Sequence, residues 1–197
     1  MSRWARMLAL VGIAVTLGSA ASRATGDEKA VLRLRAFAMN LNGGRGARTG
    51  TLDIVVERWS TDEDRDQLRS MLIEKGSDAL LKALQKLKPR AGFIRSSTSL
   101  GWDIQYAREQ VNDDGSRRII IATDRPLTFW ELTNKPRSAD YEFTLAEIRL
   151  SKEGKGEGKL VPAAKITWNQ DKRTIEIENY SNEPVRLSQV EVQGSKK

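Results

Sequence analysis

The stretch STDEDRDQLRSMLIEKGSDALLKALQKLKP, residues 60–89, has the clearest local pattern in the chain. Thr61 supplies a capping hydroxyl, and Asp64 places a carboxylate three residues later, which is typical of a helix N-terminus. Gly76 ends this first helix. A second helix follows and ends before Pro89, because the residue before a proline disfavours helical geometry. The sequence therefore predicts two short helices joined as a helical hairpin.

Both helices are amphipathic, with apolar residues at helical spacing on one face. These residues are Leu68, Met71, Leu72, Leu80, Leu81, Leu84 and Leu87. An apolar face of this size must be covered, so we expect the helical hairpin to lie over an open sheet face or to plug one end of a barrel. The acidic start of the first helix is explained by capping and by the helix dipole, which removes it as an active-site candidate.

The rest of the chain shows the two-residue alternation of β-strands. Strands are expected at 29–42, 49–59, 92–95, 101–107, 117–123 and, as a four-stranded meander, over 140–192. The turn Asn112–Gly115 makes 101–123 a hairpin. A change of phase predicts a bulge near Ala146-Glu147, Glu153–Gly158 is expected to be a turn, and Pro162 favours an edge strand or a strand start.

About eight short strands with one inserted helical hairpin indicate an α+β fold that is mostly β. Hairpin-type spacing favours an antiparallel β-sandwich or an open barrel. Residues 25–197 are expected to form one domain, since this length supports a single hydrophobic core.

Residues 1–24 have the layout of a bacterial secretory signal peptide. Arg3 and Arg6 precede an apolar run at 7–17, and small residues follow at 18–21. The run is too short to span a membrane as a helix, so no transmembrane span is expected after cleavage. A retained N-terminal anchor is the alternative. The expected location is the periplasm or the outside of the cell.

The net charge argues against a nucleic-acid partner. It is +7 for the whole chain and falls to about +4 without the leader, because three of the basic residues lie there. The remaining basic character leaves binding to an anionic surface of the envelope as a weaker alternative.

The chain contains no histidine and no cysteine, so catalytic chemistry that needs either residue is excluded. A Ser-His triad, a cysteine nucleophile and a zinc site with these ligands all fall in that class. No disulfide can form, and no cofactor or metal is expected. A calcium or magnesium site made only of oxygen ligands stays open, although the acidic runs at 62–66 and 113–114 are better explained by helix capping and by a turn.

Aromatic residues near predicted strand ends are the main binding candidates. Trp59, Trp102 and Trp130, with Arg125, would form a stacking surface for a sugar, a peptide or another small molecule. The alternative is that these tryptophans belong to the core, and it is favoured because tryptophans at strand ends are more often buried than ligand-binding. In the glycine-rich loop at 43–50, Arg45 and Arg48 are the candidate anion contacts. The spacing of these glycines does not fit a dinucleotide-binding motif, which favours a plain hairpin loop.

Carboxylate-pair hydrolysis is the enzymatic alternative, because it needs two acids facing each other across a cleft. Asp103, Asp124, Glu131 and Asp140 lie near predicted strand ends and are the acids available for it.

Several of these segments together resemble a type of uncharacterised exported bacterial protein. They are 51–59, Ser60-Thr61-Asp62, the leucine-rich helical hairpin, Gly101-Trp102-Asp103 and Ala122–Pro126. The resemblance implies export and brings no activity with it. The sequence thus favours a non-enzymatic exported protein that binds a small molecule, a polysaccharide or an envelope protein, with a carboxylate-dependent hydrolase as the alternative.

Overall fold

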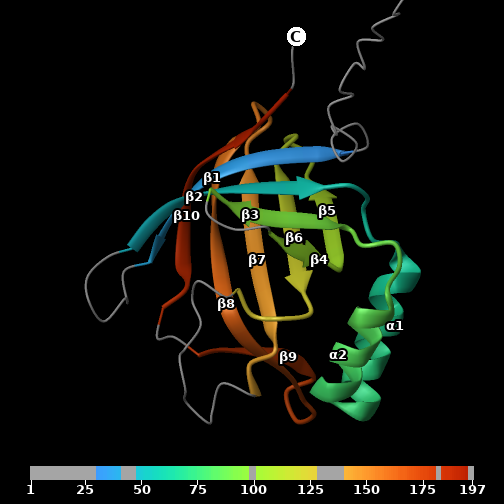
Figure 1. Cartoon of the computed structure of the whole chain (residues 1–197). Coiled ribbons are helices and arrows are strands. Elements are labelled where there is room, and N and C mark those ends of the chain that lie inside the picture. Colours follow the sequence, from blue (N-terminus) through green and yellow to red (C-terminus); the bar gives the residue numbers. More distant parts are fainter. Residues whose placement is uncertain (1–29, 41–47, 98–100, 128–139, 181–182, 195–197) are drawn as a thin grey trace, which may run out of the picture.

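The structure is a computed structural model that describes residues 30–40, 48–97, 101–127, 140–180 and 183–194. Two helices and ten strands make up this part of the chain (Figure 1). The elements are β1 (Leu32–Asn40), β2 (Arg48–Val56), α1 (Asp62–Lys75), α2 (Ser77–Lys86), β3 (Gly92–Ser96), β4 (Trp102–Ile104), β5 (Tyr106–Val111), β6 (Arg117–Thr123), β7 (Phe143–Leu150), β8 (Lys155–Asn169), β9 (Thr174–Asn179) and β10 (Val185–Val192).

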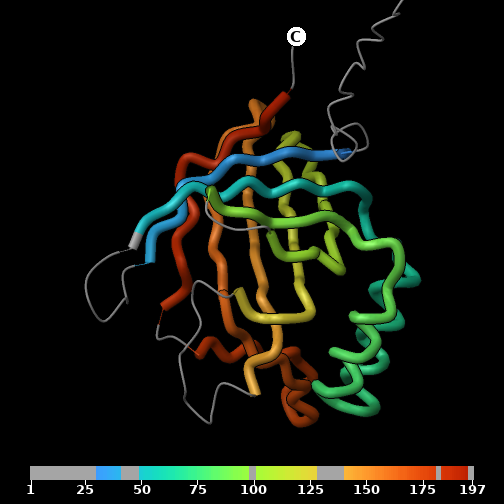
Figure 2. Tube along the Cα trace, in the orientation of Figure 1, coloured from blue at the N-terminus to red at the C-terminus, as the bar shows by residue number. Residues whose placement is uncertain are grey.

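The strands form one antiparallel sheet that curls into a nearly closed barrel. Its order is β4-β3-β2-β1-β10-β8-β7-β6-β5, and β9 branches off by pairing with β8. The first and last strands of this path are consecutive in the sequence. Residues 102–104 pair with β3, and residues 106–111 pair with β6. One extended segment therefore joins the two ends of the sheet, as the chain trace in Figure 2 shows. The predicted fold class is confirmed.

Alternating side chains fill the interior of the barrel. On β1, Leu32, Leu34, Ala36 and Ala38 are buried, as the alternation predicts. Residues from the other strands complete the same cluster, among them Ile54, Ile94, Ile119, Ile148 and Leu187. Burial of this apolar surface is the main stabilising contribution to the fold.

The helical hairpin covers one outer side of the barrel, which confirms the expected cover over a sheet face (Figure 1). The Thr61 hydroxyl accepts from the Asp64 amide at 3.1 Å, and the Asp64 carboxylate accepts from the Thr61 amide at 3.0 Å. This reciprocal cap starts α1. Gly76, at a φ of +83°, separates the two helices. The buried leucines of both helices contact a second apolar cluster that includes Phe143 and Ile166 on the outer side of β7 and β8.

This cover explains why the predicted bulge near Ala146-Glu147 is wrong. Phe143 and Leu145 belong to the cluster under the helices, whereas Ala146 and Ile148 face the interior. Both faces of β7 are covered here, so apolar residues on successive positions need no change of phase. The register shift lies earlier, between Phe143 and Leu145.

Pro162 does not mark an edge strand or a strand start, because β8 is a long central strand that pairs with β10 and β7. Phe143 lies opposite Ala164 and Leu145 opposite Val161, so β8 contributes one extra residue between these pairs. The proline sits in this bulge, where its missing N–H costs no ladder hydrogen bond. Its carbonyl accepts from the Thr144 hydroxyl at 2.8 Å.

The four strands from residue 140 onward are not a simple meander. Strand β9 pairs with the far part of β8 only, and β10 returns to pair with the near part of β8 and with β1. Likewise, only the second part of the predicted hairpin at 101–123 is a hairpin, formed by β5 and β6.

Candidate functional site

The predicted aromatic site is placed mostly in the core. Trp102 is 4% exposed and belongs to the barrel interior, so its ring offers no open face for stacking. Trp59 is partly buried and packs against the same cluster. Both positions agree with the core alternative for these tryptophans. Trp130 lies outside the described residues.

Arg125 is exposed, and its contacts with the described residues are made by its backbone carbonyl. Its carbonyl accepts hydrogen bonds from the hydroxyls of Thr123 and Thr144, the latter at 3.1 Å. Arg45 and the side chain of Arg48 lie outside the described residues, so their predicted anion binding stays a prediction.

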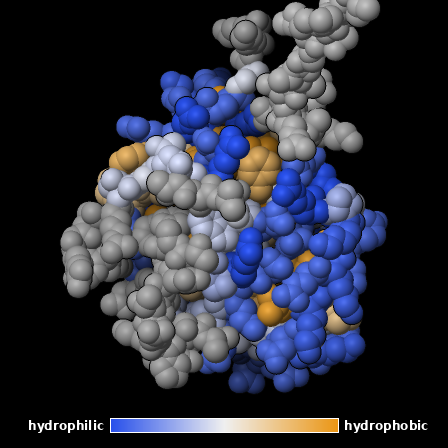
Figure 3. All heavy atoms as spheres, in the orientation of Figure 1, coloured by the Kyte–Doolittle hydropathy of each residue, from blue (hydrophilic) through white to orange (hydrophobic). Residues whose placement is uncertain are grey.

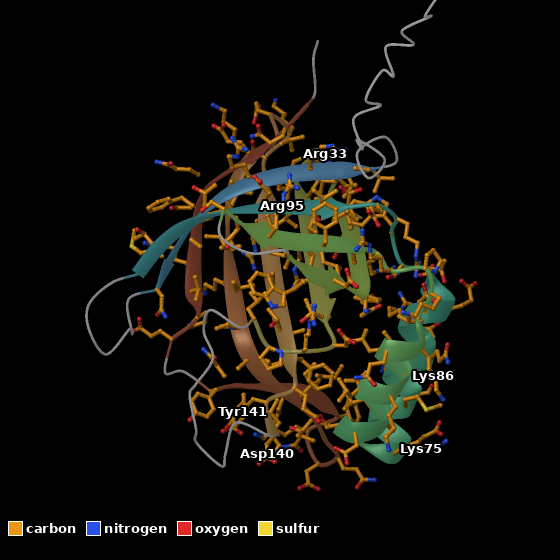
Figure 4. All side chains as sticks on the ribbon, in the orientation of Figure 1. Arg33, Lys75, Lys86, Arg95, Asp140 and Tyr141 are labelled. Atoms are coloured by element: carbon orange, nitrogen blue, oxygen red, sulfur yellow. The ribbon has the colours of Figure 1, made fainter. Side chains whose placement is uncertain are left out.

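The described acids of the hydrolase alternative lie in different surroundings. Asp103 accepts from Arg90 at 2.6 Å, and Arg90 also holds Glu57 through two hydrogen bonds. Asp124 is half-buried after β6, and Asp140 is exposed before β7 at the bottom of the barrel (Figure 4). Glu131 lies outside the described residues.

The outer face of the barrel carries charges of both signs in cross-strand pairs. Asp53 on β2 contacts Arg35 on β1 at 3.1 Å and Arg95 on β3 at 3.5 Å. Lys155 on β8 contacts Glu191 on β10 at 3.5 Å. The basic residues labelled in Figure 4 are spread between the barrel, where Arg33 and Arg95 lie, and the helical hairpin. The visible face is accordingly hydrophilic, with small apolar areas between charged residues (Figure 3).

A groove of about 430 Å³ lies on the outer side of the sheet, over β7, β8 and β10. Its lining residues are Glu147, Arg149, Glu157, Gly158, Lys159, Glu183, Pro184 and Arg186. A volume of this size is sufficient for a small organic molecule. Because the side chains of a strand alternate between the two faces, the charged lining residues of β7 and β8 point outward, while Ile148 and Leu160 next to them face the core.

One wall of the groove is held in place by a bidentate ion pair. Arg118 on β6 donates to both carboxylate oxygens of Glu147, at 3.0 and 3.3 Å, and Arg149 donates to the same carboxylate at 2.9 Å. The hydrogen bonds from Arg118, and then those from Arg149, lower the pKa of Glu147 below its ordinary range. This carboxylate is therefore ionised at neutral pH and is unsuited to act as a general acid.

The other wall of the groove contains two cations side by side. Lys159 on β8 and Arg186 on β10 are directly opposite each other in the antiparallel register, and both are exposed. Neither makes a recorded ion pair within the described part of the chain. Glu157 is close to Lys159 in the sequence, and Glu183 is close to Arg186. Both glutamates also line the groove.

The sequence analysis did not find this groove because it assigned Glu153–Gly158 to a turn. That assignment is wrong from Lys155 onward, where β8 begins. Gly156 and Gly158 face the interior, opposite large residues such as Leu150 and Leu187, and the backbone of β7 comes close to both glycines. The alternation of lysine and glutamate with glycine over 155–159 was the signal of a strand with one charged face.

No family model matches this chain, and no curated protein or solved structure matches it significantly. The resemblance to exported bacterial proteins therefore stays a prediction. In the described part of the chain, no helix is long and apolar enough to cross a membrane. The same residues contain no group of three or more acidic side chains placed to hold a metal ion.

Proposed function

We propose that this protein is a non-enzymatic exported binding module, and that the groove over β7, β8 and β10 holds its small-molecule ligand. The observation that carries the proposal is the groove itself, a concave surface of about 430 Å³ with polar groups from three strands. Sites built on strands hold their side chains more precisely than sites on loops. The Arg118–Glu147–Arg149 contacts fix one wall before any ligand arrives.

Binding is favoured over hydrolysis by the state of the acids. Glu147 is ionised and already engaged by two arginines, and Asp103 is engaged by Arg90. A hydrolase with a carboxylate pair needs one acid that is protonated at the working pH. Export rests on the sequence of residues 1–24, and it fits a ligand met in the bacterial envelope.

A thermal-shift screen tests the proposal. A panel of sugars, amino acids, organic acids and lipid headgroups is added to the mature protein, and a ligand that binds only the native state raises the melting temperature. The matched variants are Glu157→Trp, which fills the groove, and Glu63→Trp, which places the same side chain at an exposed position of α1. We expect at least one compound to stabilise the wild type and Glu63→Trp but not Glu157→Trp.

Two results would count against the proposal. The first is a panel without any stabilising compound, and the second is equal stabilisation of Glu157→Trp and the wild type. Mass spectrometry of each stabilising compound after incubation with the protein tests the alternative. Release of hydrolysis products would favour the carboxylate-dependent hydrolase instead.

A further inference from the structure

Lys159 and Arg186 differ from several other cations of the barrel surface, which form ion pairs. Neighbouring basic residues hold carboxylates across the strands, as Arg35 holds Asp53 and Arg117 holds Glu109 at 3.1 Å each. Lys159 and Arg186 instead face each other in register, one on each side of the β8–β10 pairing. Within the described residues, no recorded ion pair neutralises either of them.

Two like charges on directly opposite strand positions destabilise a sheet. Glu147 lies opposite Lys159 on the β7 side, but Arg118 and Arg149 already engage its carboxylate. Within the described residues, neither Glu157 nor Glu183 forms an ion pair with the two cations. An anion placed between the two side chains would remove the repulsion and would gain charge-assisted hydrogen bonds from both. The planar guanidinium of Arg186 suits a two-oxygen acceptor, and the Lys159 ammonium adds a point charge beside it.

The other residues of the groove limit the total charge of the ligand. Glu147, Glu157 and Glu183 line it together with Arg149 and the cation pair, so the lining has three acids and three bases. A polyanion would meet this negative charge as soon as it extended beyond the cation pair. A molecule with one anionic group and a neutral or cationic remainder avoids that repulsion.

We infer that the groove binds a small organic acid with a single anionic group, a carboxylate or a phosphate ester, held between Lys159 and Arg186. This inference rests on the proposed function, because it names the class of ligand for the same groove. It also implies that repulsion between Lys159 and Arg186 destabilises the free protein, and that the bound ligand removes this repulsion.

Direct titration with matched probes tests the inference at low ionic strength. N-acetylalanine and methyl phosphate represent the two anionic groups, N-acetylalanine amide is the neutral control, and citrate is the polyanion. We expect one or both of the first two to bind, with little binding of the amide or of citrate. Lys159→Gln and Arg186→Gln should each weaken binding by about tenfold or more. Lys86→Gln, on the helical hairpin (Figure 4) and not among the lining residues of the groove, should leave it unchanged.

A second measurement needs no ligand. Lys159→Gln removes one of two repelling charges, so it should raise the melting temperature of the free protein in low salt, and added salt should shrink the difference. A lower melting temperature would mean that Lys159 has an attractive partner, which would overturn the premise.

The outcomes separate this inference from the proposed function. Equal binding of N-acetylalanine and its amide, or tight binding of citrate, would overturn the inference. Binding of neutral compounds that Glu157→Trp blocks would overturn it as well, while the proposed function would stand. Failure of every probe to bind wild-type protein, in this titration and in the thermal-shift screen, would overturn both.

Discussion

Ser60 and Ala107 are joined by two hydrogen bonds that run in opposite directions. The Ser60 amide donates to the Ala107 carbonyl at 2.7 Å, and the Ala107 amide donates to the Ser60 hydroxyl oxygen at 3.1 Å. Ser60 immediately precedes the cap of α1, and Ala107 lies in β5, in the segment that closes the barrel. This pair therefore ties the start of the helical hairpin to the closure of the sheet.

Replacement of Ser60 by alanine should destabilise the protein by about 1–3 kcal/mol. Ser60 is 6% exposed, so water cannot replace the lost hydroxyl, and the Ala107 amide would stay buried without an acceptor. Equilibrium unfolding in urea measures the effect. Ser70→Ala, at an exposed position of α1, is the control and should change stability by less than about 0.5 kcal/mol. Equal stability of the two variants would show that this hydrogen bond is unimportant.

Replacement of Gly156 by alanine should cost about 3 kcal/mol or more, or prevent folding. A Cβ at Gly156 would lie 1.8 Å from the Arg149 carbonyl oxygen, and this backbone atom cannot move without breaking the pairing of β7 with β8. A Cβ at Gly50 in β2 would meet no atom of another segment within 4 Å, so Gly50→Ala is the matched control. Thermal unfolding of both variants gives the comparison, and similar melting temperatures would contradict the close approach at Gly156.

Local patterns were sufficient to predict the helical hairpin and much of the sheet. The cap at Thr61 and the break at Gly76 depend only on neighbouring residues, so the limits of α1 follow from the sequence. The alternation on β1 was equally reliable, because one face of that strand is core and the other is solvent. The expectation that the helices cover a sheet face followed from the size of their apolar side.

Features that depend on neighbouring strands were not predictable in this way. Gly156 and Gly158 were assigned to a turn because glycine usually marks one, yet they face the core where β7 leaves no room for a side chain. The charged groove was missed as a consequence. Segment 102–111 was predicted as one arm of a hairpin. Instead, its first part pairs with β3 and its second part pairs with β6. This split depends on closure of the barrel, which brings together strands that are far apart in the sequence.

The ion pairs of Glu147 should make a pH-dependent contribution to stability. Hydrogen bonds from Arg118, and secondly from Arg149, lower the pKa of this carboxyl below its ordinary value of 4.5. A group with a lowered pKa stabilises the folded state fully above its unfolded pKa, and this contribution disappears as the pH falls through the folded pKa. Wild type should therefore be more stable than Glu147→Gln near neutral pH, and the difference should shrink as the pH falls below 4.5 and through the lowered pKa of the folded state.

Urea unfolding of both proteins over a pH series measures this difference. Glu147 is partly exposed, so solvent screens the pair and the effect should be modest. Glu74→Gln, at an exposed position of α1 with no ion pair among the described residues, is the control for loss of one carboxylate. A constant difference for Glu147→Gln would contradict the lowered pKa.

Strand β9 combines exposed apolar side chains with an edge of the sheet. Ile175 and Ile177 are 47% and 56% exposed. They lie opposite Trp168 and Ile166 of β8. The helices cover this face over β8 but not over β9. In the described part of the chain, β9 pairs with β8 alone, which leaves the backbone groups of its other side for a further strand. We therefore expect β9 to promote association of the chain with itself.

The double variant Ile175→Thr, Ile177→Thr tests this role of β9, because it keeps the β-branched shape and removes apolar surface. It should reduce light scattering of concentrated samples, with a change in unfolding free energy of less than about 1 kcal/mol. Val31→Thr, at a residue that is 53% exposed next to β1, removes apolar surface beside a strand that is paired on both sides and should leave scattering unchanged. A similar decrease of light scattering in both variants would mean that exposed apolar area in general causes the association. No decrease in either variant would show that β9 is not its cause.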